Sequence, residues 1–501
     1  MRLSELIQDL DIQTFGSSAE ADVAGLACDS REIQPGWAFV ALKGEHSDGA
    51  GFIPQVLAAG ASAIFCDRKL DIDCPVPFGV LSGNPRETMA LLARRIHGAP
   101  DARIPVIGVT GTNGKTTTTM LIRQLLRGSG RGCGLIGTVL NAAGDDESEA
   151  TRTSPESPVF YRWLKKSADA GDVVLAIETS SHALCQARVH GARFKLGVFT
   201  NLTQDHLDFH GDMESYFRAK CRMFDQAEAV LVNADDAYGR RIQEERPARS
   251  YAVERPADYR AAEVVLSPTG TRFRLETPMG AWDIASPLLG RFNVYNLLAA
   301  LASLVEAGFD MAEILAAVPG VKGAPGRIER VDCGQPFGVM VDYAHTPDAL
   351  DKLLTEGKRL LPPGGRLQVL FGCGGDRDRT KRPLMAAAVA AAADVVWHTS
   401  DNTRGEDPGR ILDDGAAGIP SIIRGDEARY HRIADRALAV ETAIRNCRPG
   451  DLLLLAGKGH EPYQEIHGVN HPYSDRAAVE AVLRGEAVPR PWGSQLEEHA
   501  E

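Results

Sequence analysis

Residues Ile104 to Met120 read "IPVIGVTGTNGKTTTTM". A short apolar run is followed by a turn containing Gly111 and Gly114 and then by a helical pattern, so the stretch predicts a strand, a loop and a helix. Backbone N–H groups in such a loop, together with the positive end of the helix, bind phosphate, and a lysine at the position of Lys115 reaches the terminal phosphates.

This loop is a variant of the common phosphate-binding motif. Val109 stands where that motif has its first glycine, whereas Lys115 and the hydroxyl residue Thr116 are kept. A hydroxyl at this position binds magnesium in phosphate-binding loops. The alternative is a threonine-rich helix start without a ligand, and phosphate binding explains more of the residues.

Two segments after the loop carry candidate metal ligands. "LAIETSSH" places Glu178 at the end of a predicted strand, where it is either a magnesium ligand or a solvated acid. "NLTQDHLDFHGDMESYFRAKCRMF", residues 201–224, is rich in Asp and His but has no known zinc spacing, so we expect magnesium with one histidine. Lys220, on an amphipathic helix in this segment, reads as an ordinary surface lysine from the pattern alone.

Two later segments carry polar residues where helices begin. "LLGRFNVYNLLAALA" sets Asn293 and Asn296 one turn apart, to cap the helix or to hydrogen-bond a base. "VDYAHTPDAL" ends a predicted strand with Asp342, which either accepts hydrogen bonds from ribose hydroxyls or belongs to the approach to the next helix.

Apolar strands alternate with helical patterns along most of the chain, which predicts an α/β fold with parallel sheets. Breaks near residue 98 and at "VKGAPGRIERV" divide it into three predicted domains: a small N-terminal α/β domain at 1–98, a central parallel-sheet domain with the phosphate loop at 99–325, and a C-terminal Rossmann-like domain at 326–501.

Composition excludes several classes of function. With 55 basic and 67 acidic residues, a net charge of −12 and no basic cluster, the chain of 501 residues is not expected to bind nucleic acid. No apolar run reaches the length of a membrane span, and the first residues lack the apolar core of a secretory signal. Nine scattered cysteines without a C-x-x-C pair indicate reduced thiols, so we expect a cytoplasmic protein.

A family resemblance emerges from the motifs taken together. "GTNGKTT", "ETSSHAL", "DHLDFHGDMESYFRAK", "GRFNVYN", "GRIERV", "DYAHTPDAL", "GGDRDRTKRP" and "AGKGHE" stand in the order and spacing of the Mur ligases, from about Asp29 to Glu461. The chain most resembles the branch that adds meso-diaminopimelate to the D-glutamate of UDP-N-acetylmuramoyl-L-alanyl-D-glutamate. The resemblance implies a bacterial, monomeric enzyme of peptidoglycan synthesis that uses ATP and Mg²⁺.

The resemblance also implies roles for individual residues around ATP. Lys115, Lys220 and His206 would be catalytic, and Lys220 would be carbamylated to N6-carboxylysine, which reverses its reading as a surface lysine. Magnesium would be held by Thr116, Glu178 and His206. The implied ATP contacts are Gly111, Thr112, Asn113, Gly114, Lys115, Thr116, Thr117, Asn293, Arg327 and Asp342.

Two further sets of residues would bind the other substrates. The implied contacts of the UDP-linked dipeptide, with UDP bound in the N-terminal domain, are Ser30, Glu45, His46, Ser47, Thr153, Ser154, Ser180, Gln186 and Arg188. Those of diaminopimelate are Arg377, Asp401, Asn402, Thr403, Arg404, Gly457 and Glu461. The chain reads "RTS" where relatives have Asn-Thr-Thr, and Thr403 replaces the proline of the family's Asp-Asn-Pro-Arg.

Arg404 distinguishes the addition of meso-diaminopimelate from the addition of L-lysine. A guanidinium pairs bidentately with the distal carboxylate of diaminopimelate, whereas L-lysine ends in an ammonium. The alternatives that stay open are the lysine-adding relative, a folylpolyglutamate synthetase-like ligase, and a nucleotide-dependent switch without ligase chemistry.

Overall fold

The computed structural model describes residues 1–15, 21–44, 47–267 and 269–491. The predicted contacts Glu45 and His46 therefore lie outside the described residues. Two compact units form the chain. The first comprises Met1–Val264, Phe273–Ala285 and Val294–Val321, and the second comprises Val265–Arg272, Ser286–Asn293 and Lys322–Glu501.

The first unit begins with a five-stranded sheet in the order β1-β5-β4-β3-β2, in which only β1 runs antiparallel to its neighbour. Its strands are β1 (Ile12–Phe15), β2 (Gly25–Ala27), β3 (Trp37–Ala41), β4 (Ala63–Cys66) and β5 (Phe78–Leu81). Its helices are α1 (Leu3–Ile7), α2 (Ile53–Ala58) and α3 (Pro85–Ile96), with the short turns η1 (Ser30–Glu32), η2 (Gly49–Phe52) and η3 (Pro100–Ala102).

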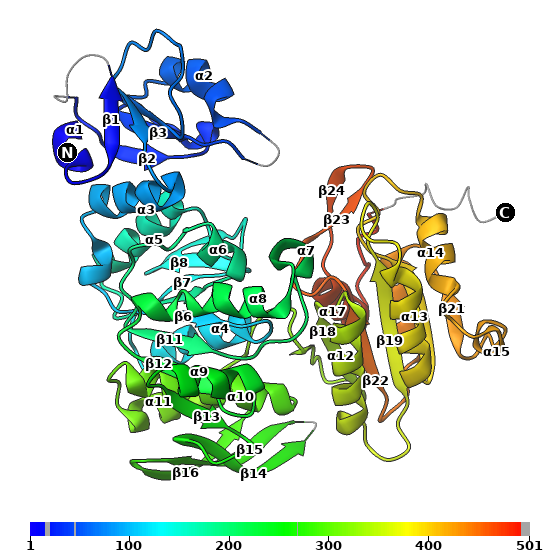
Figure 1. Ribbon diagram of the computed structural model, residues 1–501. Helices are drawn as coiled ribbons and strands as arrows, with labels where there is room; N and C mark the ends of the chain where they lie inside the picture. Colours follow the sequence, from blue (N-terminus) through cyan, green and yellow to red (C-terminus); the bar gives the residue numbers. More distant parts are fainter. Residues whose placement is uncertain (16–20, 45–46, 268, 492–501) are drawn as a thin grey trace. The chain divides into compact units, whose positions relative to one another are not determined.

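An eleven-stranded sheet follows, most of it in the first unit, in the order β16-β15-β14-β13-β12-β11-β6-β10-β7-β8-β9 (Figure 1). Its strands are β6 (Val106–Thr110), β7 (Gly134–Ile136), β8 (Leu140–Ala143), β9 (Asp146–Glu149), β10 (Leu175–Glu178), β11 (Leu196–Phe199), β12 (Val230–Asn233), β13 (Arg249–Ala252), β14 (Tyr259–Ser267), β15 (Gly270–Thr277) and β16 (Gly280–Ser286).

Helices cover this sheet and carry most of the polar residues considered below. They are α4 (Lys115–Gly128), α5 (Ser157–Asp169), α6 (Ser181–Cys185), α7 (Leu207–His210), α8 (Met213–Cys221), α9 (Ala237–Glu245), α10 (Arg291–Glu306) and α11 (Met311–Ala317), with the turns η4 (Phe224–Gln226) and η5 (Val318–Gly320).

The central sheet is parallel from β7 to β14, as the alternation of strand and helix patterns predicts. Every residue of β6 is buried, because both faces of a parallel sheet are covered. One difference from the sequence prediction is the edge: β8 pairs antiparallel with β7, and β9 pairs antiparallel with β8. No sequence pattern predicts β9, since its four residues, "DESE", are all exposed and lack an apolar face.

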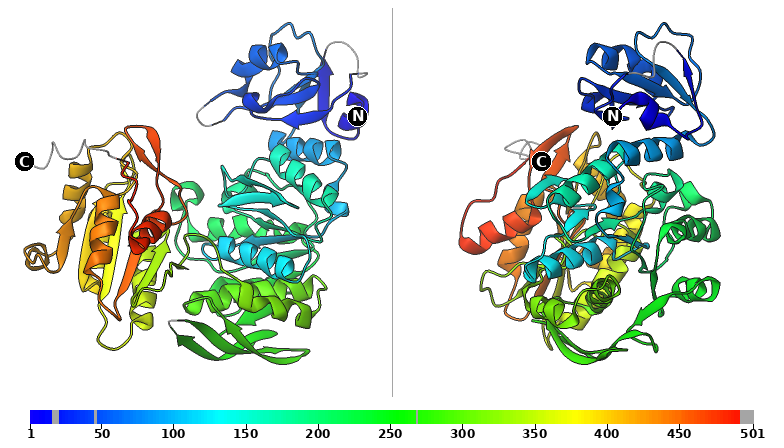
Figure 2. Two further views of the ribbon diagram at one scale, coloured as in Figure 1. Left: turned by 180° about the vertical axis from the view of Figure 1, so that it is seen from behind. Right: turned by 90° about the vertical axis from the view of Figure 1, so that its left-hand side faces the viewer.

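The second unit contains a six-stranded sheet in the order β17-β18-β22-β19-β20-β21 and a separate hairpin (Figure 2). The strands are β17 (Glu329–Arg330), β18 (Gly338–Asp342), β19 (Leu367–Cys373), β20 (Val395–Ser400), β21 (Tyr430–Arg432) and β22 (Leu452–Ala456), and β23 (Tyr463–Ile466) pairs with β24 (Val469–Pro472). The helices are α12 (Pro347–Leu360), α13 (Lys381–Ala392), α14 (Pro408–Ala416), α15 (Ser421–Arg424), α16 (Arg436–Asn446) and α17 (Asp475–Arg484).

Alternating residues of these strands form two cores on opposite faces of the sheet. On one face, Phe371 and Leu454 pack with residues of α12, α13 and α14. On the other, Leu370 and Leu453 pack with residues of α16 and α17. This period of two residues along buried strands produces the doubly wound layering predicted for the C-terminal part of the chain.

The carboxyl ends of the parallel strands explain why the predicted residues gather. In open α/β sheets, loops at these ends form the ligand crevice. In the first unit the phosphate loop follows β6, Glu178 ends β10, and Thr200 follows β11. In the second unit Asp342 ends β18, while Asp401 follows β20 and Gly457 follows β22.

Candidate active site

The phosphate loop connects β6 to α4 through residues 111–114. Gly111 and Gly114 have φ of 147° and 86°, values that side chains with a Cβ rarely adopt. A Cβ on Gly111 would lie 1.9 Å from Thr200 Oγ1, and one on Gly114 would lie 2.6 Å from Asn296 Oδ1. Both glycines are therefore required by backbone conformation and by close neighbours.

Residues after β11 hold the loop from one side. The Asn201 side-chain Oδ1 accepts from Asn113 N at 2.9 Å, and the Asn201 backbone carbonyl accepts from Thr112 N at 2.8 Å. Thr200 Oγ1 donates to the Asn113 carbonyl at 2.6 Å. The sequence did not single out Thr200 or Asn201, because their partners lie nearly 90 residues earlier in the chain.

A fully buried carboxylate lies beside the first turn of α4. Glu178 is 0% exposed, and its Oε2 accepts from Thr116 Oγ1 at 2.8 Å and from Thr138 Oγ1 at 3.0 Å. Its Oε1 accepts from Thr138 N at 2.7 Å. This cluster of carboxylate and hydroxyl oxygens is the hard donor set that magnesium prefers. Thr138, which the sequence prediction missed, anchors the carboxylate from the loop after β7.

Two lysine ammonium groups point to one carbonyl oxygen of the loop. Lys115 Nζ donates to Gly111 O at 2.9 Å and to Thr112 O at 2.8 Å, and Lys220 Nζ donates to Gly111 O at 2.9 Å. Lys220 is 1% exposed, and its Nζ lies 4.4 Å from the ring centroid of Tyr216. Burial and the nearby charge of Lys115 lower the pKa of Lys220 well below its usual value.

His206 lies in a group of aromatic rings rather than beside Glu178. Its ring centroid is 4.8 Å from that of His182 and 6.1 Å from that of Tyr216, and its side chain is 47% exposed. Among the described residues, no three His, Cys, Asp or Glu side chains converge as metal ligands. The chain thus brings Thr116 and Glu178 together, and it does not join His206 to them in a complete set.

Five of the predicted contacts of the UDP-linked dipeptide form one cluster next to the end of β10, namely Thr153, Ser154, Ser180, Gln186 and Arg188. Ser154 Oγ donates to the Glu178 carbonyl at 2.7 Å, and Ser180 N donates to Ser154 Oγ at 3.1 Å. Arg188 donates to Ser154 O at 2.8 Å and to Gln186 Oε1 at 2.6 Å. Thr153 Oγ1 accepts from Thr138 Oγ1 at 3.1 Å, which links this cluster to the carboxylate beside the loop.

Glu156 is a residue of this cluster that the sequence did not indicate. Its carboxylate forms ion pairs with Arg86 at 3.2 Å, Arg152 at 3.3 Å and Arg188 at 3.0 Å. Three guanidinium groups around one carboxylate leave a net positive charge, which suits an anionic substrate. Ser30 is the first residue of η1, and Ser47 is exposed.

The predicted nucleotide contacts of the second unit lie at the end of β18. Asp342 Oδ2 accepts from Ile328 N and its Oδ1 from Ala344 N, each at 2.8 Å. Burial raises the pKa of Asp342, while the charge of Arg327 opposes the shift. The Arg327 guanidinium lies 4.8 Å from the ring centroid of Tyr343. Asn293 is 4% exposed and donates to the Leu289 carbonyl at 2.8 Å.

The loops after β20 and β22 meet around a buried lysine, which we name the Lys458 cluster: Lys458 with Asp401, Asn402 and Glu461. Lys458 Nζ donates to Asn402 Oδ1 at 2.8 Å and to Glu461 Oε2 at 2.9 Å, and lies 3.8 Å from Asp401 Oδ1. Asn402 Nδ2 donates to the same Glu461 Oε2 at 2.9 Å. A Cβ on Gly457 would lie 2.6 Å from Asp401 Oδ2, so only glycine fits there.

Arg404 lies next to this cluster with an unusual backbone. Its φ is 52°, a conformation that costs about 1 kcal/mol or more for a residue with a side chain. Its guanidinium donates to Gly375 O at 2.8 Å and pairs with Glu465 at 3.3 Å. Arg377 is exposed beside it, whereas Thr403 is 0% exposed and its hydroxyl has no hydrogen-bond partner among the described residues.

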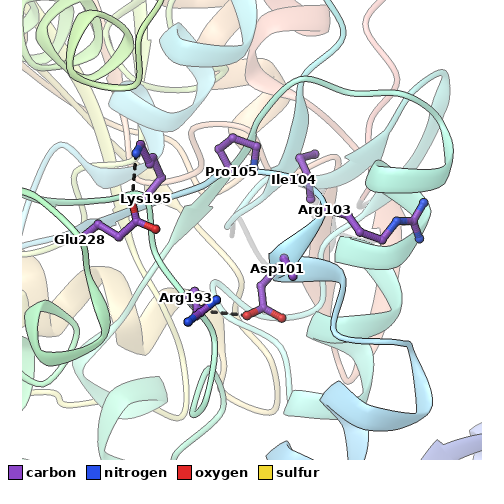
Figure 3. A pocket seen from close by; sticks show the side chains of 8 residues that line it. Asp101, Arg103, Ile104, Pro105, Arg193, Lys195 and Glu228 are labelled. Atoms are coloured by element: carbon purple, nitrogen blue, oxygen red, sulfur yellow. Dashed lines mark hydrogen bonds and ion pairs between the residues drawn. The ribbon is translucent and has the colours of Figure 1, made fainter.

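A cavity of about 240 Å³ lies elsewhere, at the amino ends of β6 and β11 (Figure 3). Its lining includes Asp101, Arg193, Lys195 and Glu228. Lys195 pairs with Glu228 at 2.9 Å, and Arg193 N donates to Asp101 at 3.1 Å. This cavity is at the opposite end of the strands from the phosphate loop, so it is not part of the candidate active site.

Three family models match consecutive parts of the chain. "Mur ligase family, catalytic domain" matches residues 22–109, "Mur ligase middle domain" matches 109–304, and "Mur ligase, glutamate ligase domain" matches 326–459. Together they span residues 22–304 and 326–459.

Curated relatives match over nearly their full length. The UDP-N-acetylmuramoyl-L-alanyl-D-glutamate--2,6-diaminopimelate ligase of Geobacillus thermodenitrificans (strain NG80-2) is 43% identical over 495 residues, which cover 97% of this chain and 99% of that protein. The enzyme of the same name from Solibacter usitatus (strain Ellin6076) is 42% identical, covering 93% of this chain and 94% of that protein. A solved structure of a ligase of this name has a TM-score of 0.70 at 34% identity, covering 97% and 99% of the two chains.

Proposed function

The chain belongs to the Mur ligase family, and from this premise we propose that it adds meso-diaminopimelate to the D-glutamyl residue of UDP-N-acetylmuramoyl-L-alanyl-D-glutamate, with hydrolysis of ATP to ADP and phosphate. The product is a precursor of peptidoglycan. The observation that carries the proposal is the convergence of Lys115, Lys220 and the Thr116–Glu178 pair on the phosphate loop of a chain that aligns end to end with ligases of this name.

The reaction has to activate a carboxylate, which resists attack by an amine because oxide is a poor leaving group. The side-chain carboxylate of the D-glutamyl residue attacks the γ-phosphorus of ATP, so that ADP leaves and an acyl phosphate forms. The amine of diaminopimelate then attacks the acyl carbon, loses a proton and expels inorganic phosphate, which leaves an amide. Catalysis is mainly electrostatic, because several anions have to be held together.

The residues around the phosphate loop fit this task. Loop N–H groups and Lys115 bind the phosphates once Lys115 releases the carbonyls of Gly111 and Thr112. Thr116 and Glu178 would hold one Mg²⁺ and His206 would contribute to a second; when bound, these ions would neutralise the charge that develops on the phosphoryl oxygens.

Lys220 is proposed to act as a carbamate. Addition of CO₂ to an amine needs the unprotonated form, and the lowered pKa of the buried Lys220 supplies it. The adduct gives Lys220 a negative charge beside the ammonium of Lys115, so the two side chains attract each other.

Arg404 supports diaminopimelate as the amino acid. Its guanidinium lies beside the Lys458 cluster and would pair with the distal carboxylate in competition with Glu465.

We also propose ATP contacts at Asn293, Arg327 and Asp342. The same holds for the three-domain division at 98/99 and 325/326, a monomeric state and a cytoplasmic location. None of the described helices is long and apolar enough to cross a membrane.

The test compares two amino acids in one assay. The protein is incubated with ATP, magnesium and UDP-N-acetylmuramoyl-L-alanyl-D-glutamate, together with meso-diaminopimelate or L-lysine, and both phosphate release and product mass are measured. The proposal predicts an adduct with diaminopimelate and little with lysine. A lysine adduct would point to the lysine-adding relative, and phosphate release without any adduct would favour a nucleotide-dependent switch.

A further inference from the structure

The Lys458 cluster contains two carboxylates and one buried cation. Lys458 is 0% exposed and lies within 4 Å of both Asp401 and Glu461. Its positive charge attracts both carboxylates and so holds the loops after β20 and β22 together.

The hydrogen bonds of Glu461 give its two oxygens different surroundings. Oε2 accepts from Lys458 Nζ and from Asn402 Nδ2, both at 2.9 Å. For Oε1, no partner is found among the described residues, and the Glu461 side chain is 19% exposed whereas that of Lys458 is 0% exposed. Lys458 thus holds the carboxylate from the buried side and leaves one oxygen directed to the accessible side.

The charge balance defines what the accessible side can bind. The formal charges of Asp401, Glu461 and Lys458 sum to −1, and Arg404, a few residues along the same loop, carries a guanidinium that pairs with Glu465. A group with an ammonium near Glu461 and a carboxylate near Arg404 complements this arrangement, which is the zwitterionic end of an amino acid.

We propose that Lys458 is a positioning residue for the amino acid substrate: it holds the Glu461 carboxylate in place and so sets the affinity for the ammonium of the incoming amino acid. This inference rests on the proposed ligase function and adds to it a residue that no sequence motif assigned. Lys458 acts through Glu461 and does not itself contact the substrate.

The test uses Lys458→Met, which keeps most of the side-chain volume and removes the charge. Because a hydrogen bond to a charged group contributes about 1.5–3 kcal/mol, the KM for diaminopimelate is expected to rise about 10- to 100-fold. The KM values for ATP and for the UDP-linked dipeptide should change less than twofold. Lys458→Gln, which can still donate to Glu461, should fall between the wild type and Lys458→Met, and it serves if the methionine variant does not fold.

A matched control removes an ion pair near the opposite end of β22. Arg366 pairs with the largely buried Asp451 at 2.6 Å just before the amino end of β22, whereas Lys458 lies just beyond its carboxyl end. Arg366→Met should lower the melting temperature and leave the KM for diaminopimelate unchanged. A rise in that KM in the control as well would assign the effect of Lys458→Met to general destabilisation and overturn the proposal.

A double mutant shows whether Lys458 acts through Glu461. If it does, Glu461→Gln combined with Lys458→Met has about the same KM as the more severe single variant, because both remove one function. If the KM increases of the two single variants multiply in the double variant, the proposal is contradicted. An unchanged KM in Lys458→Met would also contradict it. Wild-type protein that forms no adduct would instead refute the proposed ligase function, so the two failures are distinguishable.

Discussion

Replacement of Arg436 tests how the second unit holds its two ligand-bearing loops. Arg436 and Asp475 are each 0% exposed and form a bidentate pair at 2.8 and 2.7 Å. The same guanidinium donates to the Ser400 carbonyl at 3.2 Å and to the Ala456 carbonyl at 3.0 Å, which are the last residues of β20 and β22. One side chain thus ties together the strand ends that lead into the Lys458 cluster.

The expected cost follows from what Arg436→Met leaves behind. Asp475 would keep a buried charge, with the Tyr473 hydroxyl at 3.0 Å as its remaining side-chain donor, and two buried carbonyls would lose a donor. Removing one partner of a buried ion pair costs about 3–5 kcal/mol. Arg436→Lys, which keeps the charge but not the bidentate geometry, should cost about 1–2 kcal/mol.

Urea unfolding, followed by circular dichroism, measures these differences in the free energy of unfolding. Lys352→Met is the control, since Lys352 forms an exposed ion pair with Asp348 on α12 and its loss should cost less than about 0.5 kcal/mol. At temperatures where Arg436→Met remains folded, its KM for diaminopimelate should rise. A loss below about 1 kcal/mol would refute the reasoning, because it would mean that Asp475 is relieved by solvent or by protonation at little cost.

Three further predictions concern other groups. Glu178→Gln should lower the rate of phosphate release with all three substrates about 100-fold or more, since the ionised carboxylate beside Thr116 is lost, and an unchanged rate would exclude Glu178 from metal binding. Thr403→Val should stabilise the protein by about 1 kcal/mol in a thermal melt, because it removes a buried hydroxyl that has no hydrogen-bond partner among the described residues; destabilisation would contradict this. Burial lowers the pKa of His398 from 6.5 to about 3, so the folded state keeps this histidine neutral while the unfolded chain protonates it below pH 6.5. Stability should therefore fall as the pH drops from 7.5 to 5, by about 2 kcal/mol from this residue, and His398→Gln should flatten the measured curve of melting temperature against pH.

Local patterns predicted the parts of the site that are local in the chain. The strand, loop and helix from Ile104 to Met120 are contiguous, and the structure places them as β6, the phosphate loop and α4. Glu178 was predictable because a strand end determines where its last residue lies. Its hydrogen bond with Thr138 was not, because the two residues are 40 positions apart and no pattern relates β7 to β10 before the sheet order is known.

The burial of the charged residue Lys458 was likewise not predictable from local sequence patterns. In the sequence it stands in "AGKGHE" among glycines, where a lysine is expected to be exposed. Its burial depends on Asn402, which lies 56 residues earlier and becomes a neighbour only because β20 and β22 end at the same edge of the sheet. Likewise, the exposed strand β9 has no apolar face and exists because β8 offers it an edge.

The convergence of Lys115 and Lys220 on the Gly111 carbonyl has a consequence for inhibitor design. Lys115 already donates to the Gly111 and Thr112 carbonyls, so a phosphate-bearing ligand has to replace these partners of Lys115 before it gains the charge interaction. A heterocyclic fragment that carries no anion and leaves the loop as it is avoids this exchange. Screening should therefore recover uncharged scaffolds at this site more readily than phosphate mimics of comparable size.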